Sequence, residues 1–153
     1  MTVEQGSVLP RICGLTQDES ELALDAWRGH WVVLYFYPKD NTPGCTREAQ
    51  AFNEHRADFE ALGARIVGVS ADSPASHRRF ADKYGLQFPL ISDQRKEIIQ
   101  ALGVLNDKGT GARRSTLIID PEGVIRHVFS RVTVDGHVDE VLAKLRELQR
   151  SGN

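Results

Sequence analysis

The most constraining feature of the sequence is an apolar run that leads through a short polar loop into a helix start. The run Trp31–Tyr37 is rich in aromatic and β-branched residues and is closed by Pro38, which predicts a buried strand. Thr42 is then a suitable N-cap, and Pro43 suits the first helical position because its missing N–H would be unpaired there anyway. Cys45 becomes the third helical residue, with its sulfur near unpaired backbone N–H groups and the positive end of the helix macrodipole. This environment favours thiolate over thiol, so Cys45 is the candidate nucleophile.

A second interpretation of Cys45 is that it is an ordinary core residue. Helical spacing places Cys45, Phe52 and Phe59 on one stripe with Ala49 beside them, which predicts that the sulfur faces the interior. Free cysteines are among the most buried residue types, and many of them act as small hydrophobic side chains. Position alone therefore leaves both interpretations open.

The rest of the chain alternates short apolar runs with helical patterns. The helix that starts at Pro43 is expected to close near Leu62, with Gly63 as its C-cap. Leu9, Ile12 and Leu15 are compatible with short early strands. Further strands are predicted at 64–70, 88–92, 115–120 and 124–129, and helices at 74–84, about 94–102 and about 138–148. A turn is predicted at 16–20, a short helix or helical turn at 22–27, and a mobile polar loop at 106–113.

This order of elements predicts an α/β fold. Strands that are separated by helices should pair in parallel through right-handed crossovers, and the last two strands should add an antiparallel hairpin. The result is a mixed central sheet with helices on both faces. A length of 153 residues, with 41% hydrophobic and 26% charged residues, suits a single globular domain over 1–153.

Composition excludes several functional classes. The net charge is −2 with acidic and basic residues interspersed, so neither nucleic acid nor a membrane is expected as a partner. Residues 1–10 lack the basic flank and apolar core of a signal peptide, and two cysteines are too few for a disulfide framework, which predicts a reducing, cytoplasmic location. No bound metal or cofactor is expected: the histidines, interpreted as surface or supporting residues, lack ligand spacing. These are His30, His55, His77, His127 and His137.

The stretch from Tyr35 to Ala49, YFYPKDNTPGCTREA, resembles the active-site signature of the peroxiredoxins. Pro38, Thr42 and Cys45 match the core of the pattern, and the extended string resembles the bacterioferritin-comigratory, or Q-type, branch. The resemblance covers roughly residues 30–148 and implies a thioredoxin-like fold. It also implies a thiol peroxidase acting on hydrogen peroxide and small organic hydroperoxides, with thioredoxin, glutaredoxin or a low-molecular-weight thiol as reductant. Relatives in this branch are often monomers, which is the expectation here.

In such an enzyme the Cys45 thiolate attacks the peroxide and becomes a sulfenic acid. The Thr42 hydroxyl is expected to contact the incoming oxygen, a role that competes with N-capping, and the N–H groups of Gly44 and Cys45 point to the same place. The resemblance assigns Pro38 to shielding the sulfur from water. Tyr37 is a further candidate for lining the pocket.

The resemblance also implies an arginine just before the first strand of the final hairpin. Arg114 is assigned to this role, and Arg113 is the alternative if the alignment shifts by one residue. Glu48 either holds Arg114 or Arg47 in place or is simply a first-turn glutamate favoured by the helix dipole.

The sequence departs from the branch in its second cysteine. Many relatives carry a resolving cysteine five residues after the first one, where this chain has Gln50, and others carry it on the next helix, where 74–85 has none. Only Cys13 remains, either as a resolving cysteine or as a structural bystander, and a disulfide with Cys45 needs Cα atoms within about 7 Å. The leading expectation is a one-cysteine cycle with an external thiol. A redox-sensing or binding module that uses oxidation of Cys45 without turnover is the alternative, whereas a disulfide reductase lacks its C-x-x-C pair.

Overall fold

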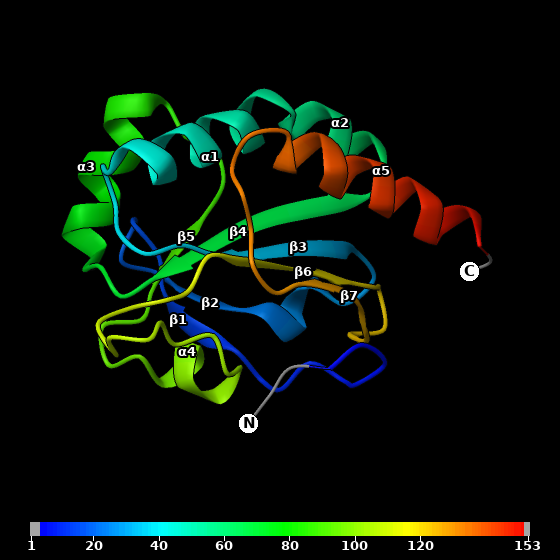
Figure 1. Ribbon diagram of the computed structural model, residues 1–153, viewed down its shortest axis with the longest axis horizontal. Coiled ribbons are helices and arrows are strands. Elements are labelled where there is room, and N and C mark those ends of the chain that lie inside the picture. The colour runs from blue at the N-terminus through cyan, green and yellow to red at the C-terminus, as the bar shows by residue number, and fades with distance from the viewer. Residues whose placement is uncertain (1–3, 152–153) are drawn as a thin grey trace.

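The computed structural model describes residues 4–151, which are organised around one mixed seven-stranded sheet (Figure 1). The spatial order of the strands is β2-β1-β5-β4-β3-β6-β7. β3, β4 and β5 run parallel, and every other neighbouring pair is antiparallel. The strands are β1 Cys13–Leu15, β2 Glu21–Ala23, β3 Trp31–Phe36, β4 Ala64–Ser70, β5 Leu90–Ser92, β6 Ser115–Ile119 and β7 Ile125–Phe129.

Helices cover both faces of this sheet, as predicted. α1 Pro43–Glu54, α2 Arg56–Ala61, α3 Pro74–Tyr84 and α5 His137–Arg150 pack on one face. α4 Glu97–Ala101 and a short 3₁₀ helix, Leu24–Trp27, pack on the other (Figure 1). Among residues 4–151, no helix has the combination of length and apolar character that crossing a membrane requires.

β3 lies at the centre because its sequence supplies apolar side chains to both faces. All six residues of Trp31–Phe36 are buried. Val33 and Tyr35 belong to the core beneath α1 and α5, whereas Leu34 and Phe36 belong to the core on the α4 side. A strand without a polar face is stable only between two packed layers, so β3 is held in the core on both sides. The loop that follows β3 therefore begins at a fixed position.

The single helix predicted for 43–62 is wrong in one respect, because it is interrupted at His55. There ψ is 8°, and the His55 carbonyl accepts N–H groups from both Asp58 and Phe59, so the chain tightens into a 3₁₀-like turn before α2. Gly63 follows α2 with a φ of +72° and ends the helical segment as predicted.

The boundaries of α3 are those predicted, whereas other elements are shorter. Ser73 caps α3 by accepting the Ser76 N–H, and Gly85 ends it in the left-handed conformation. The helix predicted for 94–102 begins only at Glu97, because Lys96 adopts a φ of +60°. The strand predicted for 88–92 is confined to β5.

The structure also corrects the interpretation of the early chain. The segment predicted as a short helix or helical turn over 22–27 forms a helical turn only in the 3₁₀ helix, whereas its first two residues belong to β2. β1 and β2 extend the central sheet at its edge. The loop predicted for 106–113 is a hydrogen-bonded turn closed by a bridge between Leu105 and Ala112.

Candidate active site

The candidate site begins where β3 ends and α1 starts. Thr42 has the extended backbone of an N-cap residue, and Pro43 is the first helical residue. The prediction of a side-chain cap is wrong, however: the Thr42 hydroxyl donates to the carbonyl of Lys39 at 2.8 Å instead of accepting a helix N–H. Among the hydrogen bonds of the described residues, no protein acceptor takes the N–H groups of Gly44 and Cys45. These two donors are therefore available to a ligand at the helix start.

Cys45 is both a core residue and a neighbour of a cation. It is 1% exposed and belongs to the core cluster that contains Phe52 and Phe59, as the helical spacing predicted. Its sulfur accepts a hydrogen bond from Nη2 of Arg114 at 3.3 Å. The second feature separates Cys45 from an ordinary buried cysteine, because a guanidinium stabilises negative charge on sulfur.

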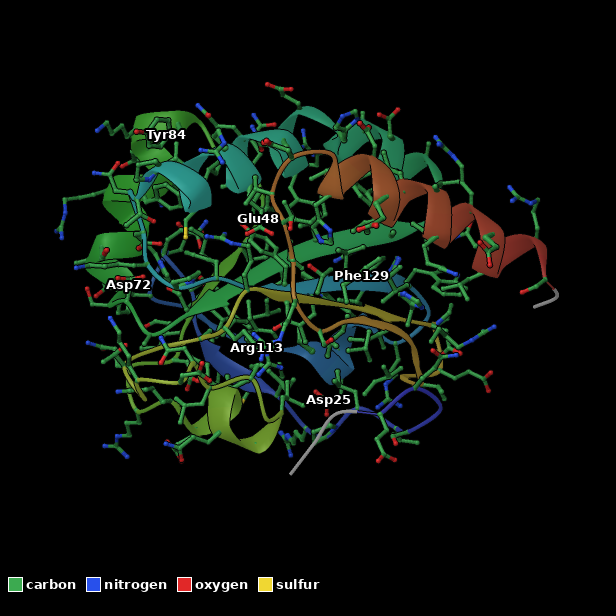
Figure 2. All side chains as sticks on the ribbon, in the orientation of Figure 1. Asp25, Glu48, Asp72, Tyr84, Arg113 and Phe129 are labelled. Atoms are coloured by element: carbon green, nitrogen blue, oxygen red, sulfur yellow. The ribbon has the colours of Figure 1, made fainter. Side chains whose placement is uncertain are left out.

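Arg114 connects the sulfur to Glu48. Its Nη1 donates to Glu48 Oε1 at 2.7 Å, and Glu48 is fully buried. Figure 2 shows Glu48 in the space between α1 and the sheet. Arg113 points elsewhere and donates to the Ser130 carbonyl at 2.8 Å, so Arg114 is the arginine that reaches the sulfur. Arg47 pairs at 3.9 Å with Asp135 rather than with Glu48.

The absence of a side chain at Gly44 lets the guanidinium approach the helix start. A Cβ at Gly44 would lie 3.2 Å from Arg114 Nη2 and 3.9 Å from its Cζ, the nearest heavy atoms outside the adjoining residues and the backbone of α1. The first of these distances is tighter than an ordinary van der Waals contact. Gly44 therefore provides both an unpaired N–H and space for Arg114.

Burial and charge oppose each other at Glu48 and Arg114. Burial raises the pKa of Glu48 to about 7, although the neighbouring Arg114 lowers it. Burial disfavours the charge of Arg114, but Glu48 and the Cys45 sulfur outweigh this effect and raise its pKa. Within residues 4–151, Glu48 Oε2 and the Tyr35 hydroxyl are buried without hydrogen-bond partners. The carboxyl group thus lies in a site that holds its proton more tightly than water does.

Comparison with known proteins identifies the family of this chain. The family model described as AhpC/TSA matches residues 6–128. Peroxiredoxin Bcp of Xanthomonas campestris is 44% identical over 133 residues, covering 83% of each chain. The chain belongs to the Bcp/PrxQ branch of the peroxiredoxins. Peroxiredoxin Q, chloroplastic, of Populus jackii is 40% identical over 148 residues, covering 95% of this chain and 70% of the relative.

Solved structures agree with this assignment. A cysteine-to-serine mutant of PrxQ from Xylella fastidiosa matches with a TM-score of 0.92 and 36% identity, covering 97% of this chain and 99% of that one. The Xanthomonas campestris bacterioferritin comigratory protein, solved as a trapped intermediate and ligand complex, matches with a TM-score of 0.85 and 40% identity over 89% and 90% of the chains. This peroxiredoxin therefore has the thioredoxin-like fold of its family, and it is a thiol peroxidase that reduces peroxides.

Two residues predicted to contact substrate differ in their placement. Pro38 is exposed, and a Cβ at Gly111 would lie 3.3 Å from its carbonyl oxygen, so the loop after α4 approaches it closely. Tyr37 is only 1% exposed, and its hydroxyl donates to Asp40 Oδ1 at 2.6 Å. The ring of Tyr37 is thus part of the core, and its hydroxyl is engaged within the protein.

Cys13 is not brought together with Cys45 in the peroxiredoxin. It is an exposed residue of β1 at the edge side of the sheet. β5 and β4 lie between β1 and β3, so about 14 Å separates the two strands at about 4.8 Å per spacing. A disulfide requires Cα atoms within about 7 Å.

The sequence interpretation missed a buried polar network behind the site. His77, predicted as a surface or supporting residue, is fully buried, and its Nδ1 lies 2.7 Å from Asp40 Oδ2. His137 is also buried and pairs with Thr116 at 2.8 Å, so a surface assignment is wrong for both histidines. The helical stripe formed by His77, Phe80, Ala81 and Tyr84 is the signal that predicts burial of His77.

The same network contains the one group among residues 4–151 whose atoms are spaced to hold a metal ion. Asp40, Asp72 and His77 offer ligand atoms within 4.8 Å of one another. Asp72 Oδ2, however, accepts the Asp40 N–H at 2.9 Å and the Ser70 hydroxyl at 2.6 Å. Protein N–H and O–H donors therefore already bind this oxygen of Asp72.

Proposed function

We propose that this peroxiredoxin reduces hydrogen peroxide and small organic hydroperoxides through a sulfenic acid on Cys45, which an external thiol then resolves. The observation that carries the proposal is the 3.3 Å contact between Arg114 Nη2 and the Cys45 sulfur at the start of α1. The Cys45 sulfur, a cation and two unpaired N–H donors converge there on one small volume. The alkyl peroxide reduction described for the Xanthomonas campestris relative supports organic hydroperoxides as substrates.

In the proposed reaction the thiolate sulfur attacks one oxygen of the O–O bond. An S–O bond forms, the O–O bond breaks, and the second oxygen leaves as an alcohol or water after taking up a proton. Sulfur is oxidised and the peroxide is reduced by the same two electrons. An external thiol then attacks the sulfenic acid, releases water and forms a mixed disulfide, and a second thiol restores Cys45.

The residues at the helix start have distinct proposed roles. The N–H groups of Gly44 and Cys45, together with Arg114, stabilise negative charge that develops on the peroxide oxygens. The Thr42 hydroxyl donates its hydrogen to the Lys39 carbonyl, so its lone pairs remain to accept a hydrogen bond from the peroxide O–H. The two N–H groups and Arg114 thus donate to one peroxide oxygen, and the Thr42 hydroxyl accepts from the other.

Supporting roles are proposed for the neighbouring side chains. Glu48 holds the guanidinium of Arg114 in place through the 2.7 Å contact. Pro38 forms the outer wall of the peroxide site, because it is exposed and has no backbone N–H to bind water there. Tyr37 acts through Asp40 rather than on the peroxide, since its hydroxyl hydrogen is already donated to that residue.

A one-cysteine cycle is favoured by the position of Cys13. Cys13 lies three strand positions from β3, and the position of the resolving residue in many relatives is Gln50, which is exposed on α1. The thiol is therefore proposed to come from outside the chain, as thioredoxin, glutaredoxin or a small thiol. The cytoplasmic location and the monomeric state stay predictions.

The test is a steady-state peroxide assay on wild type, Cys13→Ser and Cys45→Ser with each class of reductant. Wild type and Cys13→Ser are expected to consume many equivalents of peroxide at similar rates, and Cys45→Ser none. Consumption that stops near one equivalent with every reductant would indicate a sensor instead. A Cys13–Cys45 crosslink, found by mass spectrometry after one equivalent of peroxide, would refute the one-cysteine cycle.

A further inference from the structure

The loop between β3 and α1 is hydrogen-bonded to α3, a helix that, among the described residues, donates no hydrogen bond to the Cys45 sulfur. Asp40 is 6% exposed and receives hydrogen bonds from three side chains. Its Oδ1 accepts from Tyr37 at 2.6 Å, and its Oδ2 lies 2.8 Å from the Ser76 hydroxyl and 2.7 Å from His77 Nδ1. Ser76 and His77 belong to α3, so the loop is connected to α3 through one carboxylate.

His77 is fixed from both sides of its ring. Its Nε2 lies 3.1 Å from the Ile91 carbonyl of β5, and a carbonyl can only accept, so Nε2 carries a hydrogen. Nδ1 therefore shares a hydrogen with Asp40 Oδ2, whichever of the two groups owns it. The ring is fully buried, so neither contact can be exchanged for water.

The next loop residue is also held by α3. Asn41 adopts a φ of +61°, in the left-handed region that non-glycine residues seldom occupy. Its Oδ1 accepts from the Tyr84 hydroxyl at 3.2 Å and from Lys83 Nζ at 3.5 Å. Figure 2 shows Tyr84 on α3 and Asp72 at the neighbouring end of the sheet. Two consecutive loop residues are thus held immediately before Thr42, where α1 begins.

We propose that the Asp40–His77 pair is a positioning device for the peroxidase site. It holds the loop so that the first turn of α1 places the Cys45 sulfur and the two N–H donors beside Arg114, the residue that precedes β6. His77 acts through Asp40 and the loop and touches neither the sulfur nor the peroxide. The inference rests on the proposed role of Cys45 as nucleophile.

Two amide variants of His77 distinguish the hydrogen bond to Asp40 from the packing of the His77 side chain. In His77→Asn the amide nitrogen can occupy the place of Nδ1 and keep the donor to Asp40, whereas in His77→Gln it can occupy the place of Nε2 and keep the donor to Ile91. Each variant loses one hydrogen bond and remains polar. Only the first keeps the contact that the proposal depends on.

The readout is the ratio of two rate constants measured on Cys45: oxidation by hydrogen peroxide and alkylation by iodoacetamide. Alkylation needs a reactive sulfur, whereas oxidation also needs donors for the two peroxide oxygens. Displacement of the loop therefore slows oxidation more than alkylation and lowers the ratio, whereas a general loosening of the fold does not lower it. His77→Asn is expected to keep the ratio within about threefold of wild type, and His77→Gln to lower it about tenfold or more. Ile99→Ala, in the core on the other face of the sheet, is the control for destabilisation and should leave the ratio unchanged.

Equal ratios for the two His77 variants, or a lower ratio for His77→Asn than for His77→Gln, would overturn the proposal. If neither His77 variant folds, Asp40→Asn and Asp40→Ala decide it. Asp40→Asn can donate to a neutral His77 and should keep the ratio, whereas Asp40→Ala should lower it, and a wild-type ratio in Asp40→Ala overturns the proposal. A wild-type protein whose Cys45 does not react with peroxide would instead overturn the proposed function, so the two failures are distinguishable.

Discussion

Arg114 Nη2 lies 3.3 Å from the Cys45 sulfur, although the two residues are 69 positions apart in the chain. The sheet register explains the meeting: Phe36 at the end of β3 pairs with Ser115 at the start of β6, so the residue before Ser115 lies where β3 leads into α1. Gly44 then leaves room for the guanidinium. The cation of the site is therefore placed by antiparallel strand pairing.

Replacing Arg114 should slow oxidation of Cys45 more than it disturbs the fold. For Arg114→Ala we expect the second-order rate constant with hydrogen peroxide to fall about 100-fold or more, as when a preorganised donor is removed from an oxyanion site. Arg114→Lys should keep part of the rate, because it keeps the charge but loses the planar fork. Stopped-flow fluorescence measures this constant. Arg113→Ala, whose side chain contacts Ser130 instead, is the matched control, and an Arg114→Ala rate equal to that of Arg113→Ala would contradict the account.

Gly44→Ala should lower activity without lowering stability. The new Cβ would lie 3.2 Å from Arg114 Nη2, so the guanidinium must shift by a few tenths of an ångström, and we expect this shift to disturb its contact with the sulfur. We expect oxidation of Cys45 to slow about tenfold, because small misplacements of reacting groups are costly. Since alanine favours helix over glycine by about 1 kcal/mol, the free energy of unfolding should stay level or rise. A loss of activity that is matched by a loss of stability would argue against displacement of Arg114 as the cause.

Thr42→Val and Thr42→Ser test the hydroxyl as an acceptor for the peroxide. Thr42→Ser keeps the hydroxyl and should stay within about threefold of the wild-type rate, whereas Thr42→Val should lose about 10- to 100-fold. The stability cost of Thr42→Val should be about 1 kcal/mol, the value of one hydrogen bond, because the side chain does not cap α1. Peroxide kinetics and urea unfolding check the two parts. Equal peroxide rates for valine and serine would remove Thr42 from the proposed mechanism.

Glu48 should make the folded protein less stable as pH rises. Burial raises the pKa of Glu48 to about 7 in the folded state, above its ordinary value of 4.5, so the folded state binds the proton more tightly. Stability from this group is fully present below pH 4.5 and is lost as pH rises to about 7, by about 3 kcal/mol at 1.36 kcal/mol per pKa unit.

The measurement is urea unfolding at pH 5 and pH 8 for wild type and Glu48→Gln, with the difference in pH dependence attributed to Glu48. Wild type should lose more stability than Glu48→Gln between the two pH values. The same pH dependence in both proteins would mean that Glu48 is ionised throughout and paired with Arg114.

Much of the site could be predicted from local sequence. The strand, the polar loop and the helix that starts at Pro43 are specified by neighbouring residues, so Cys45 could be placed in the first turn of α1 without coordinates. The family resemblance then indicated Arg114. The structure distinguishes it from Arg113, because only the register of β6 against β3 decides which of two adjacent arginines faces the sulfur.

Other features depend on contacts that no local pattern encodes. In the sequence, Asp40 is one polar loop residue among several. Only the packing of α3 against the loop makes it a buried hydrogen-bond partner of His77. The Thr42 hydroxyl was expected to cap the helix or to contact the peroxide, and the loop conformation instead directs its hydrogen to the Lys39 carbonyl. The first two strands are three residues each, too short for an alternating pattern to show, so their place at the sheet edge was not predicted.

The central claim is that Cys45 is the sulfur on which the peroxide is reduced. The most direct measurement mixes the reduced protein with one equivalent of hydrogen peroxide and excess dimedone, then maps the adduct by mass spectrometry. The account predicts one dimedone adduct per chain, on Cys45, formed faster than any modification of Cys13 and strongly reduced in Arg114→Ala. An adduct on Cys13 with Cys45 unmodified would contradict it.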